Sequence, residues 1–252
     1  MGIRVMIKNM KLLKISILFF YFLTKHSYGN IEFNKIKQSI YHCFDNSSDC
    51  QQIKVPIELN DEIDESILSI DKFFGQNYLL MTLKYNSTPN KCYSLYEIKN
   101  HIIQTKEKQI LSDGSQLCDY KKTNDQLINR FLDGGKWYEK LYKEKEKYYQ
   151  IILEDQCIGC DMVQRKIYNK NLNYLLVTNE HNLFDRKPII KKIAVNQAYL
   201  YDDALEKSKT KMYLIEDDKV ELLQYRDDFY QIRYLTRTQK LIVKWVHSSA
   251  LL

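Results

Sequence analysis

Apolar and polar side chains alternate along much of this chain, as they do in strands that bury one face of a sheet. Before residue 190 the alternating segments are rich in Tyr, Ile and Leu, with Asn, Asp, Gly and Ser between them. This pattern predicts strands at 78–85, 93–98, 102–110, 148–153 and 162–168. Helical candidates are 31–44, 63–73 and part of 125–142. We therefore expect a mostly β fold, in which an antiparallel N-terminal domain contains a few helices.

The C-terminal segment alternates most regularly. Five short strands are predicted at 198–201, 211–214, 219–225, 229–234 and 241–246. Tightly turned strands of this length suggest a small barrel. The run Asp185-Arg186-Lys187-Pro188 breaks the pattern before this segment, so composition marks a linker near 185–192. We divide the mature chain into a β-rich domain at 30–190 and a small barrel at 191–252.

Residues 1–29 have the features of a secretory signal peptide. Basic side chains precede an apolar run at 15–23 that is broken by Ser16 alone, and Ser27-Tyr28-Gly29 offers small residues to a signal peptidase. The run is too short to span a bilayer, and no later stretch is apolar for long enough. We expect cleavage after Gly29 and a mature protein that is periplasmic or secreted.

Removal of that segment changes the charge balance. The whole chain has a formal net charge of +6, whereas residues 30–252 contain 33 Lys and Arg against 32 Asp and Glu. Nucleic-acid binding depends on a basic surface that displaces counterions from phosphates. The mature composition therefore argues against a nucleic-acid partner. The twenty tyrosines fit sheet packing better than a stacking surface, because the ring packs while the hydroxyl reaches water.

All six cysteines lie in the mature part, and an even count in an exported chain implies disulfides. Their spacing favours three local pairs: Cys43 with Cys50, Cys92 with Cys118, and Cys157 with Cys160. A C-x-x-C unit can also be a redox centre or half of a zinc site. The flanks of the last pair alternate like the strands of a hairpin, which favours a structural bridge.

The chain offers no convincing catalytic motif. It has no glycine-rich nucleotide loop, and its mature histidines lack metal-binding spacing: His42, His101, His181 and His247. Bridged cysteines would leave no thiol nucleophile. A pair of carboxylates acting as a glycosidase stays open, because their separation is invisible in a sequence. We expect no enzyme activity, no cofactor and no metal.

The C-terminal segment resembles a bacterial SH3 domain. The matching positions are Leu200-Tyr201, Asp217-Asp218, 219–222, 229–234, and Trp245-Val246 followed by Ser248, Ser249 and Leu251. The sequence departs from the family at Lys244, where glycine is usual, and at Asp218 in the turn. The resemblance implies a wall-targeting, tethering or packing module. It makes Tyr201, Phe229, Tyr234 and Trp245 candidate binding residues. For Tyr234 and Trp245, a place in the core or rim of the barrel is the favoured alternative.

Residues 94–113, 128–135 and 138–152 are similar to a half-propeller unit of periplasmic proteins that inhibit lysozyme-like hydrolases, although the acidic calcium loops of such units are not visible. Two hypotheses follow from the resemblances. In the first, the protein binds a protein partner, such as a secreted hydrolase or toxin, and acts as an inhibitor or immunity protein. In the second, the barrel binds peptidoglycan. A stripe of exposed aromatic side chains on the barrel would discriminate between them.

Overall fold

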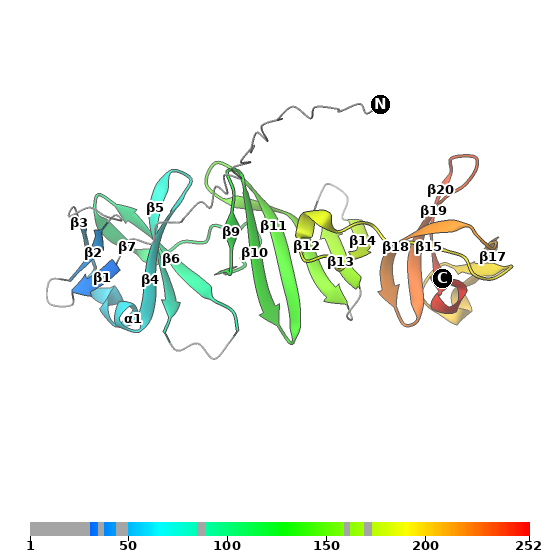
Figure 1. Ribbon diagram of the computed structural model, residues 1–252, viewed down its shortest axis with the longest axis horizontal. Coiled ribbons are helices and arrows are strands. Elements are labelled where there is room, and N and C mark those ends of the chain that lie inside the picture. Colours follow the sequence, from blue (N-terminus) through cyan, green and yellow to red (C-terminus); the bar gives the residue numbers. More distant parts are fainter. Residues whose placement is uncertain (1–30, 35–37, 44–49, 85–88, 159–161, 169–172) are drawn as a thin grey trace, which may run out of the picture.

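The computed structural model describes residues 31–34, 38–43, 50–84, 89–158, 162–168 and 173–252. These residues are mostly strand and form three sheets that lie in a row, in chain order, along the long axis of the molecule (Figure 1). The sequence prediction of a mostly β fold is confirmed. The proposed signal peptide lies outside the described residues. Within them, no helix has the length and apolar composition needed to cross a membrane.

The first sheet has the strand order β1-β2-β3-β7-β6-β5-β4, with β8 paired to β6. Its elements are β1 (Ile31–Asn34), β2 (Ser39–Cys43), β3 (Cys50–Lys54), η1 (Ile57–Leu59), α1 (Asn60–Asp64), β4 (Ser66–Phe73), β5 (Gln76–Leu83), β6 (Cys92–Lys99), β7 (Ile102–Glu107) and β8 (Leu117–Cys118). Ile40 on β2 and Ile70 on β4 contribute to one core although they lie toward opposite ends of this order. The sheet therefore curves around its core, to which Ile63 of α1 also contributes.

The middle sheet is an antiparallel meander with the order β14-β13-β12-β11-β10-β9. Its elements are β9 (Lys121–Lys122), β10 (Gln126–Asp133), β11 (Lys136–Glu144), β12 (Tyr149–Ile158), β13 (Met162–Ile167), β14 (Asn173–Thr178) and the following η2 (Leu183–Asp185). Leu127, Tyr142 and Tyr149 of this sheet share a core with Phe73 and Leu95 of the first sheet. Burial of these side chains holds the two sheets together.

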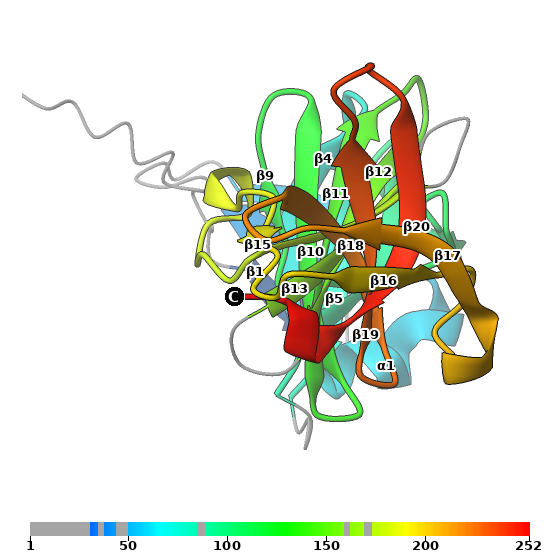
Figure 2. The same cartoon turned by 90° about the vertical axis from the view of Figure 1, so that its right-hand side faces the viewer.

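The C-terminal sheet has the order β15-β18-β19-β20-β16-β17. Its elements are β15 (Ile190–Lys192), β16 (Ala198–Tyr201), η3 (Glu206–Ser208), β17 (Lys209–Leu214), β18 (Lys219–Arg226), β19 (Phe229–Leu235), β20 (Leu241–His247) and η4 (Ser248–Ala250). All five strands predicted for this segment are confirmed, within two residues at each end. Figure 2 looks onto this end of the molecule, with β16 and β17 toward the viewer.

The segment that composition marked as a linker is paired on both sides. The Ile189 N–H donates to the Leu176 carbonyl on β14 at 2.9 Å, and the Ile189 carbonyl accepts from Leu222 on β18 at 3.0 Å. Leu176 is also part of the core of the C-terminal sheet. The middle and C-terminal sheets are thus joined through backbone hydrogen bonds and a shared core.

Three helical candidates are wrong for most of their length, and tight turns explain two of the errors. Residues 66–73 form β4 rather than a helix, because Phe74 and Gly75 adopt left-handed backbone angles and turn the chain into β5. Gly134 and Gly135 do the same between β10 and β11, in the segment 125–142. In the helical candidate 31–44, the described residues 31–34 and 39–43 form β1 and β2, and the pairing of β2 with β3 favours the extended chain there.

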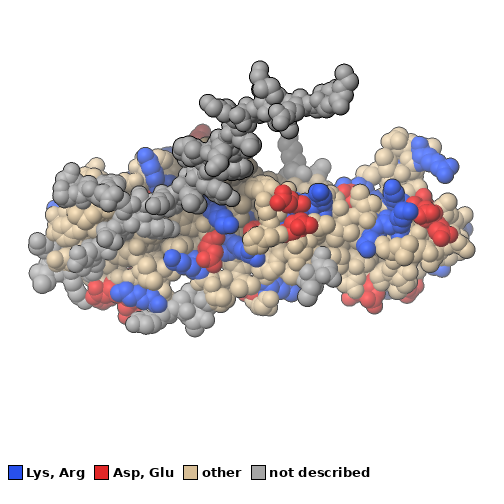
Figure 3. All heavy atoms as spheres, in the orientation of Figure 1, with Lys and Arg blue, Asp and Glu red and all other residues tan. Residues whose placement is uncertain are grey.

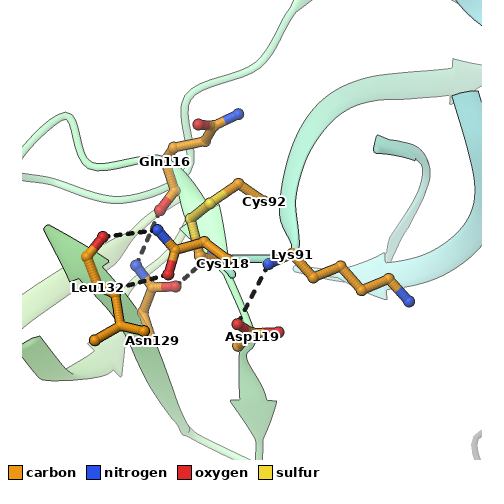
Figure 4. The surroundings of a disulfide bond; sticks show 8 residues. Lys91, Cys92, Gln116, Cys118, Asp119, Asn129 and Leu132 are labelled. Carbon is orange, nitrogen blue, oxygen red and sulfur yellow. Dashed lines mark hydrogen bonds between the residues drawn. A yellow bond between two sulfur atoms is a disulfide. The ribbon is translucent and has the colours of Figure 1, made fainter. Parts of the chain in front are cut away.

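Two of the three predicted disulfides are present, Cys43–Cys50 and Cys92–Cys118. The third pairing involves Cys160, which lies outside the described residues. Figure 4 shows the surroundings of the second bridge, which joins β6 to β8. There the Asn129 side chain accepts from the Cys118 N–H at 2.6 Å and donates to the Gln116 carbonyl at 2.9 Å. Asn129 is fully buried, and these bonds satisfy its amide while they fix β8 against β10.

Basic and acidic side chains are interspersed along the face of the molecule shown in Figure 3. Inside the middle sheet, by contrast, charges are buried as a network. Asp155 is fully buried and pairs with Arg165 at 2.7 Å and with Arg186 at 2.6 Å, and Arg186 also contacts Glu139 at 2.7 Å. The Arg186 guanidinium lies 4.9 Å from the ring centre of Trp137. The polar run 185–188 is therefore anchored to the middle sheet through Arg186.

Candidate functional site

A pocket of about 390 Å³ opens on the C-terminal sheet. It is lined by residues of β16, β20, η3, η4 and the segment before β16: Val195, Gln197, Ala198, Tyr199, Tyr201, Glu206, Val246, His247, Ser249 and Ala250. Its wall combines aromatic and aliphatic surface with hydrogen-bonding side chains. Binding pockets commonly have this composition.

Successive side chains of β16 point alternately into the core of the sheet and toward the pocket. Leu200 points into the main core of the sheet, and Tyr199 and Tyr201 therefore project from the opposite face. Tyr199 is paired with Tyr213 on β17, and Tyr201 with Trp245 on β20. We call the set Tyr199, Tyr201, Tyr213, Phe229 and Trp245 the aromatic face, since these rings form one connected group.

The aromatic face is exposed at one end and buried at the other. Tyr213 is 51% exposed, whereas Tyr201, Phe229 and Trp245 are 5–7% exposed. The Tyr201 and Phe229 rings meet edge to face, 5.0 Å between centroids. Such packing stabilises the sheet, so these three residues serve mainly as the support beneath the pocket.

Three of the four candidate binding residues thus come together, and one lies elsewhere. Tyr234 packs against the main core, and its hydroxyl donates to Asp218 at 3.1 Å, beside the turn between β17 and β18. Sequence reasoning missed Tyr199 and His247, which both line the pocket. Each stands two positions from a candidate on the same strand, Tyr201 and Trp245, so the period of two was a signal that could have found them.

Cations already cover parts of the aromatic face. The Lys209 ammonium lies 3.6 Å from the ring centre of Tyr199, and the Arg226 guanidinium lies 4.9 Å from that of Trp245. These contacts are cation–π attractions. At the pocket, burial and the nearby Glu206 raise the pKa of Tyr201, so its hydroxyl stays protonated and donates to Glu206 at 3.3 Å.

The histidine and serine in the pocket form a local cap. His247 Nδ1 lies 2.7 Å from Ser249 Oγ and accepts the Ser249 N–H at 3.3 Å, at the start of η4. A nucleophile–base pair needs a third group that orients the base. The Nδ1 atom here serves the turn, so the pair is suited to hydrogen bonding with a ligand rather than to nucleophilic attack.

A second contact between a serine and a potential base lies in the middle sheet. Lys140 Nζ is 2.8 Å from Ser115 Oγ and 2.8 Å from Asp113 Oδ2, and 3.3 Å from Glu154 Oε2. A lysine that activates serine must be neutral. Burial lowers the pKa of Lys140, but the hydrogen bond and charge of Asp113, with those of Glu154, raise it overall. Lys140 is therefore a cation and a structural link between the loop at 113–115 and the sheet.

This link predicts a defined pH dependence of stability. Burial would raise the pKa of Asp113, but hydrogen bonds from Lys140 and Ser115 outweigh it and lower the pKa. The carboxylate therefore stabilises the fold above the ordinary pKa of aspartate, and this contribution is lost as the pH falls through the lowered value. The pKa of Lys140 is raised, so its contribution to stability is fully present below the ordinary lysine pKa. That contribution is lost as the pH rises through the raised pKa.

We expect Asp113→Asn to lower the free energy of unfolding by a constant amount near neutral pH, with the difference from wild type shrinking below about pH 4. Urea denaturation at a series of pH values measures this difference. Asp133→Asn, at an exposed position on β10, is the matched control and should show little effect. A difference for Asp113→Asn that persists unchanged into strong acid would contradict the assignment.

Among the described residues, no group of three or more His, Cys, Asp and Glu side chains is placed to hold a metal ion. Comparison of the chain with models of protein families, with curated proteins and with solved structures gives no match.

Proposed function

We propose that this protein is an exported, non-enzymatic binding protein that engages a protein partner through the pocket on its C-terminal sheet. The observation that carries the proposal is the position of the pocket beside β17, the last strand in the order of that sheet. Tyr199 belongs to the pocket and is paired with Tyr213 on β17, so a ligand could contact both. The two disulfides support an oxidising compartment, in keeping with the signal-like N-terminus.

The geometry favours a polypeptide over a glycan as the ligand of this site. A glycan platform needs exposed ring faces, but most of the aromatic face is buried and Lys209 covers the ring of Tyr199. An edge strand, by contrast, offers backbone groups to an extended segment of another chain. On β17 and just after it, Met212, Tyr213 and Ile215 are 40–51% exposed. They provide apolar contacts beside the edge, and the pocket can accept a side chain.

We further propose that 191–252 is an SH3-like barrel and that the partner is a cell-wall-degrading enzyme or toxin, which this protein inhibits as an immunity protein would. The short antiparallel strands of the C-terminal sheet and the resemblance at Leu200-Tyr201 and Trp245-Val246 support the barrel. The half-propeller resemblance, which spans β6 to β12, supports the inhibitor. The alternative is that the C-terminal segment targets peptidoglycan, and the SH3 resemblance favours it.

One experiment separates these functions. The oxidised mature chain, residues 30–252, is mixed with peptidoglycan sacculi and with a panel of purified muramidases, amidases and peptidases that cleave them. We expect the protein to stay in the supernatant when sacculi are pelleted and to slow lysis by at least one enzyme. Pelleting without inhibition would overturn the inhibitor proposal and favour binding to peptidoglycan. Neither pelleting nor inhibition would overturn both proposals.

Variants locate the interaction. Tyr213→Ser removes an exposed ring of the aromatic face, and we expect it to weaken inhibition about tenfold or more, as loss of an aromatic contact residue does at interfaces. Leu241→Ser is the matched control, because Leu241 is similarly exposed on β20 of the same sheet, where it is paired with Leu235 rather than with the aromatic face. Equal loss of inhibition in both variants would place the interface elsewhere.

A further inference from the structure

A second pocket lies on the first sheet, at the far end of the molecule from the site above (Figure 1). It has a volume of about 330 Å³. Its hydrogen-bonding side chains are His42 from β2, Gln51 from β3, Asn77 from β5, and Asn100 and His101 from the turn between β6 and β7. His42 and His101, which are 59 positions apart in the sequence, line one cavity because β2, β3 and β7 are neighbours in the sheet.

The floor of this pocket is apolar. Ile53, Ile70 and Ile98 line it, and all three belong to or pack against the core around which the first sheet curves. Ile53 is 3% exposed, whereas Gln51, Asn77, Asn100 and His101 are exposed. The pocket therefore combines an aliphatic floor, in which Ile53 is buried and Ile70 and Ile98 are half-buried, with a rim of hydrogen-bonding groups.

Every side chain described as lining this pocket is uncharged or an imidazole. Burial lowers the pKa of His42, which favours its neutral form. Amide side chains both donate and accept hydrogen bonds, and a neutral imidazole does the same through its two nitrogens. Such a lining gives an ion no charged partner, but it matches a neutral ligand that carries several hydroxyl groups.

At the rim of the pocket, a histidine occupies a turn position that favours glycine. Asn100 and His101 form a two-residue turn in which both residues have positive φ, 49° and 59°. Glycine is favoured at the second position of such a turn, and a histidine there costs conformational free energy. The His101 carbonyl accepts the Lys54 N–H at 2.8 Å, so the turn needs only the backbone of this residue for its contact with β3. The imidazole is thus not required by the turn, and it lines the pocket.

We propose that this pocket binds a neutral polyhydroxylated ligand of the size of a mono- or disaccharide. The aliphatic floor contacts the nonpolar face of a sugar ring, and the amides and imidazoles bind its hydroxyl groups. A volume of about 330 Å³ lies in the range of small-molecule sites. The site is independent of the protein partner proposed for the C-terminal sheet.

The test uses the mature chain and a panel of neutral sugars, with N-acetylglucosamine, its β-1,4-linked disaccharide and maltose as probes. Binding is followed by shifts of the histidine ring and side-chain amide signals in NMR spectra. We expect saturable shifts of His42, His101 and Asn77 with at least one probe. Absence of shifts in these signals with every probe would overturn the proposal.

His101→Gly is the decisive variant, because glycine suits the turn and keeps the backbone hydrogen bond from Lys54. We expect affinity to fall about tenfold or more while the melting temperature stays the same or rises. Gln239→Gly, at a position with φ of 62° in the turn before β20, is the matched control and should bind as wild type does. Wild-type affinity in His101→Gly and in a second variant, Asn77→Ala, would show that the sugar binds elsewhere.

Discussion

Replacement of Arg186 by methionine is expected to lower the free energy of unfolding by about 3–5 kcal/mol, because it leaves buried charge without its partner. The Arg186 side chain is 2% exposed and contacts the carboxylates of Asp155 and Glu139. Its Nε also donates to the Glu180 carbonyl at 2.9 Å. Methionine has a similar length but can make none of these bonds.

The expected loss of unfolding free energy arises mainly at Asp155, which is fully buried. Arg165 donates to both carboxylate oxygens of Asp155, each at 2.7 Å, and the Arg186 contact adds a second cation at 2.6 Å. Removal of one cation leaves the carboxylate partly uncompensated in a medium of low polarity. The same substitution releases the segment 180–187 from β12, so the pairing of 187–189 with β14 should loosen with it.

Urea denaturation of the oxidised mature protein measures the loss. Lys187→Met is the matched control, since this neighbouring cation is exposed, and its free energy of unfolding should lie within about 0.5 kcal/mol of wild type. A loss below about 1 kcal/mol for Arg186→Met would contradict the network. Combination with Asp155→Asn should cost much less than the sum of the two single losses, because both variants break the same contact.

Arg186 also illustrates what composition cannot reveal. The run Asp185-Arg186-Lys187-Pro188 is polar and contains proline, which is typical of a linker. Only Arg186 of this run is buried. Its burial depends on Asp155 and Glu139, about thirty to fifty residues earlier, and no local pattern in the sequence indicates these ion pairs. Most strands were predictable because the alternation of apolar and polar residues is a local pattern. The hairpins at Phe74-Gly75 and Gly134-Gly135 were missed because an apparent helical pattern was given more weight than these turn residues.

In the candidate sites, too, some residues were predictable from local patterns and others depend on the tertiary structure. Tyr201 and Trp245 were found because the resemblance aligned their strands, and the period of two extends to Tyr199 and His247. Tyr213 required the register between β16 and β17, which spacing does not fix when a bulge intervenes. His42 and His101 line one pocket through the pairing of β2 with β3 and of β3 with β7, and the spacing of residues in the sequence does not reveal that pairing.

The Cys92–Cys118 disulfide should contribute more stability than the Cys43–Cys50 disulfide. Each bridge restricts the unfolded chain, and the restriction grows with the length of the loop that it closes. The sequence separations are 26 and 7 residues, for which chain entropy gives about 3.5 and about 2.4 kcal/mol. The first bridge also joins β6 to β8, whose Cys118 N–H is bonded to the buried Asn129 (Figure 4).

Double replacement by serine tests this difference for each bridge in turn. We expect the Cys92→Ser, Cys118→Ser protein to lose about 3–4 kcal/mol of unfolding free energy in urea, and the Cys43→Ser, Cys50→Ser protein to lose about 2–3 kcal/mol. Cys118 is 4% exposed, so a serine hydroxyl there adds a desolvation cost that strengthens the same ordering. Replacement of both cysteines by alanine removes that cost. If the alanine pairs reverse the order, local packing around the 43–50 bridge, rather than loop length, determines the contribution of these disulfides.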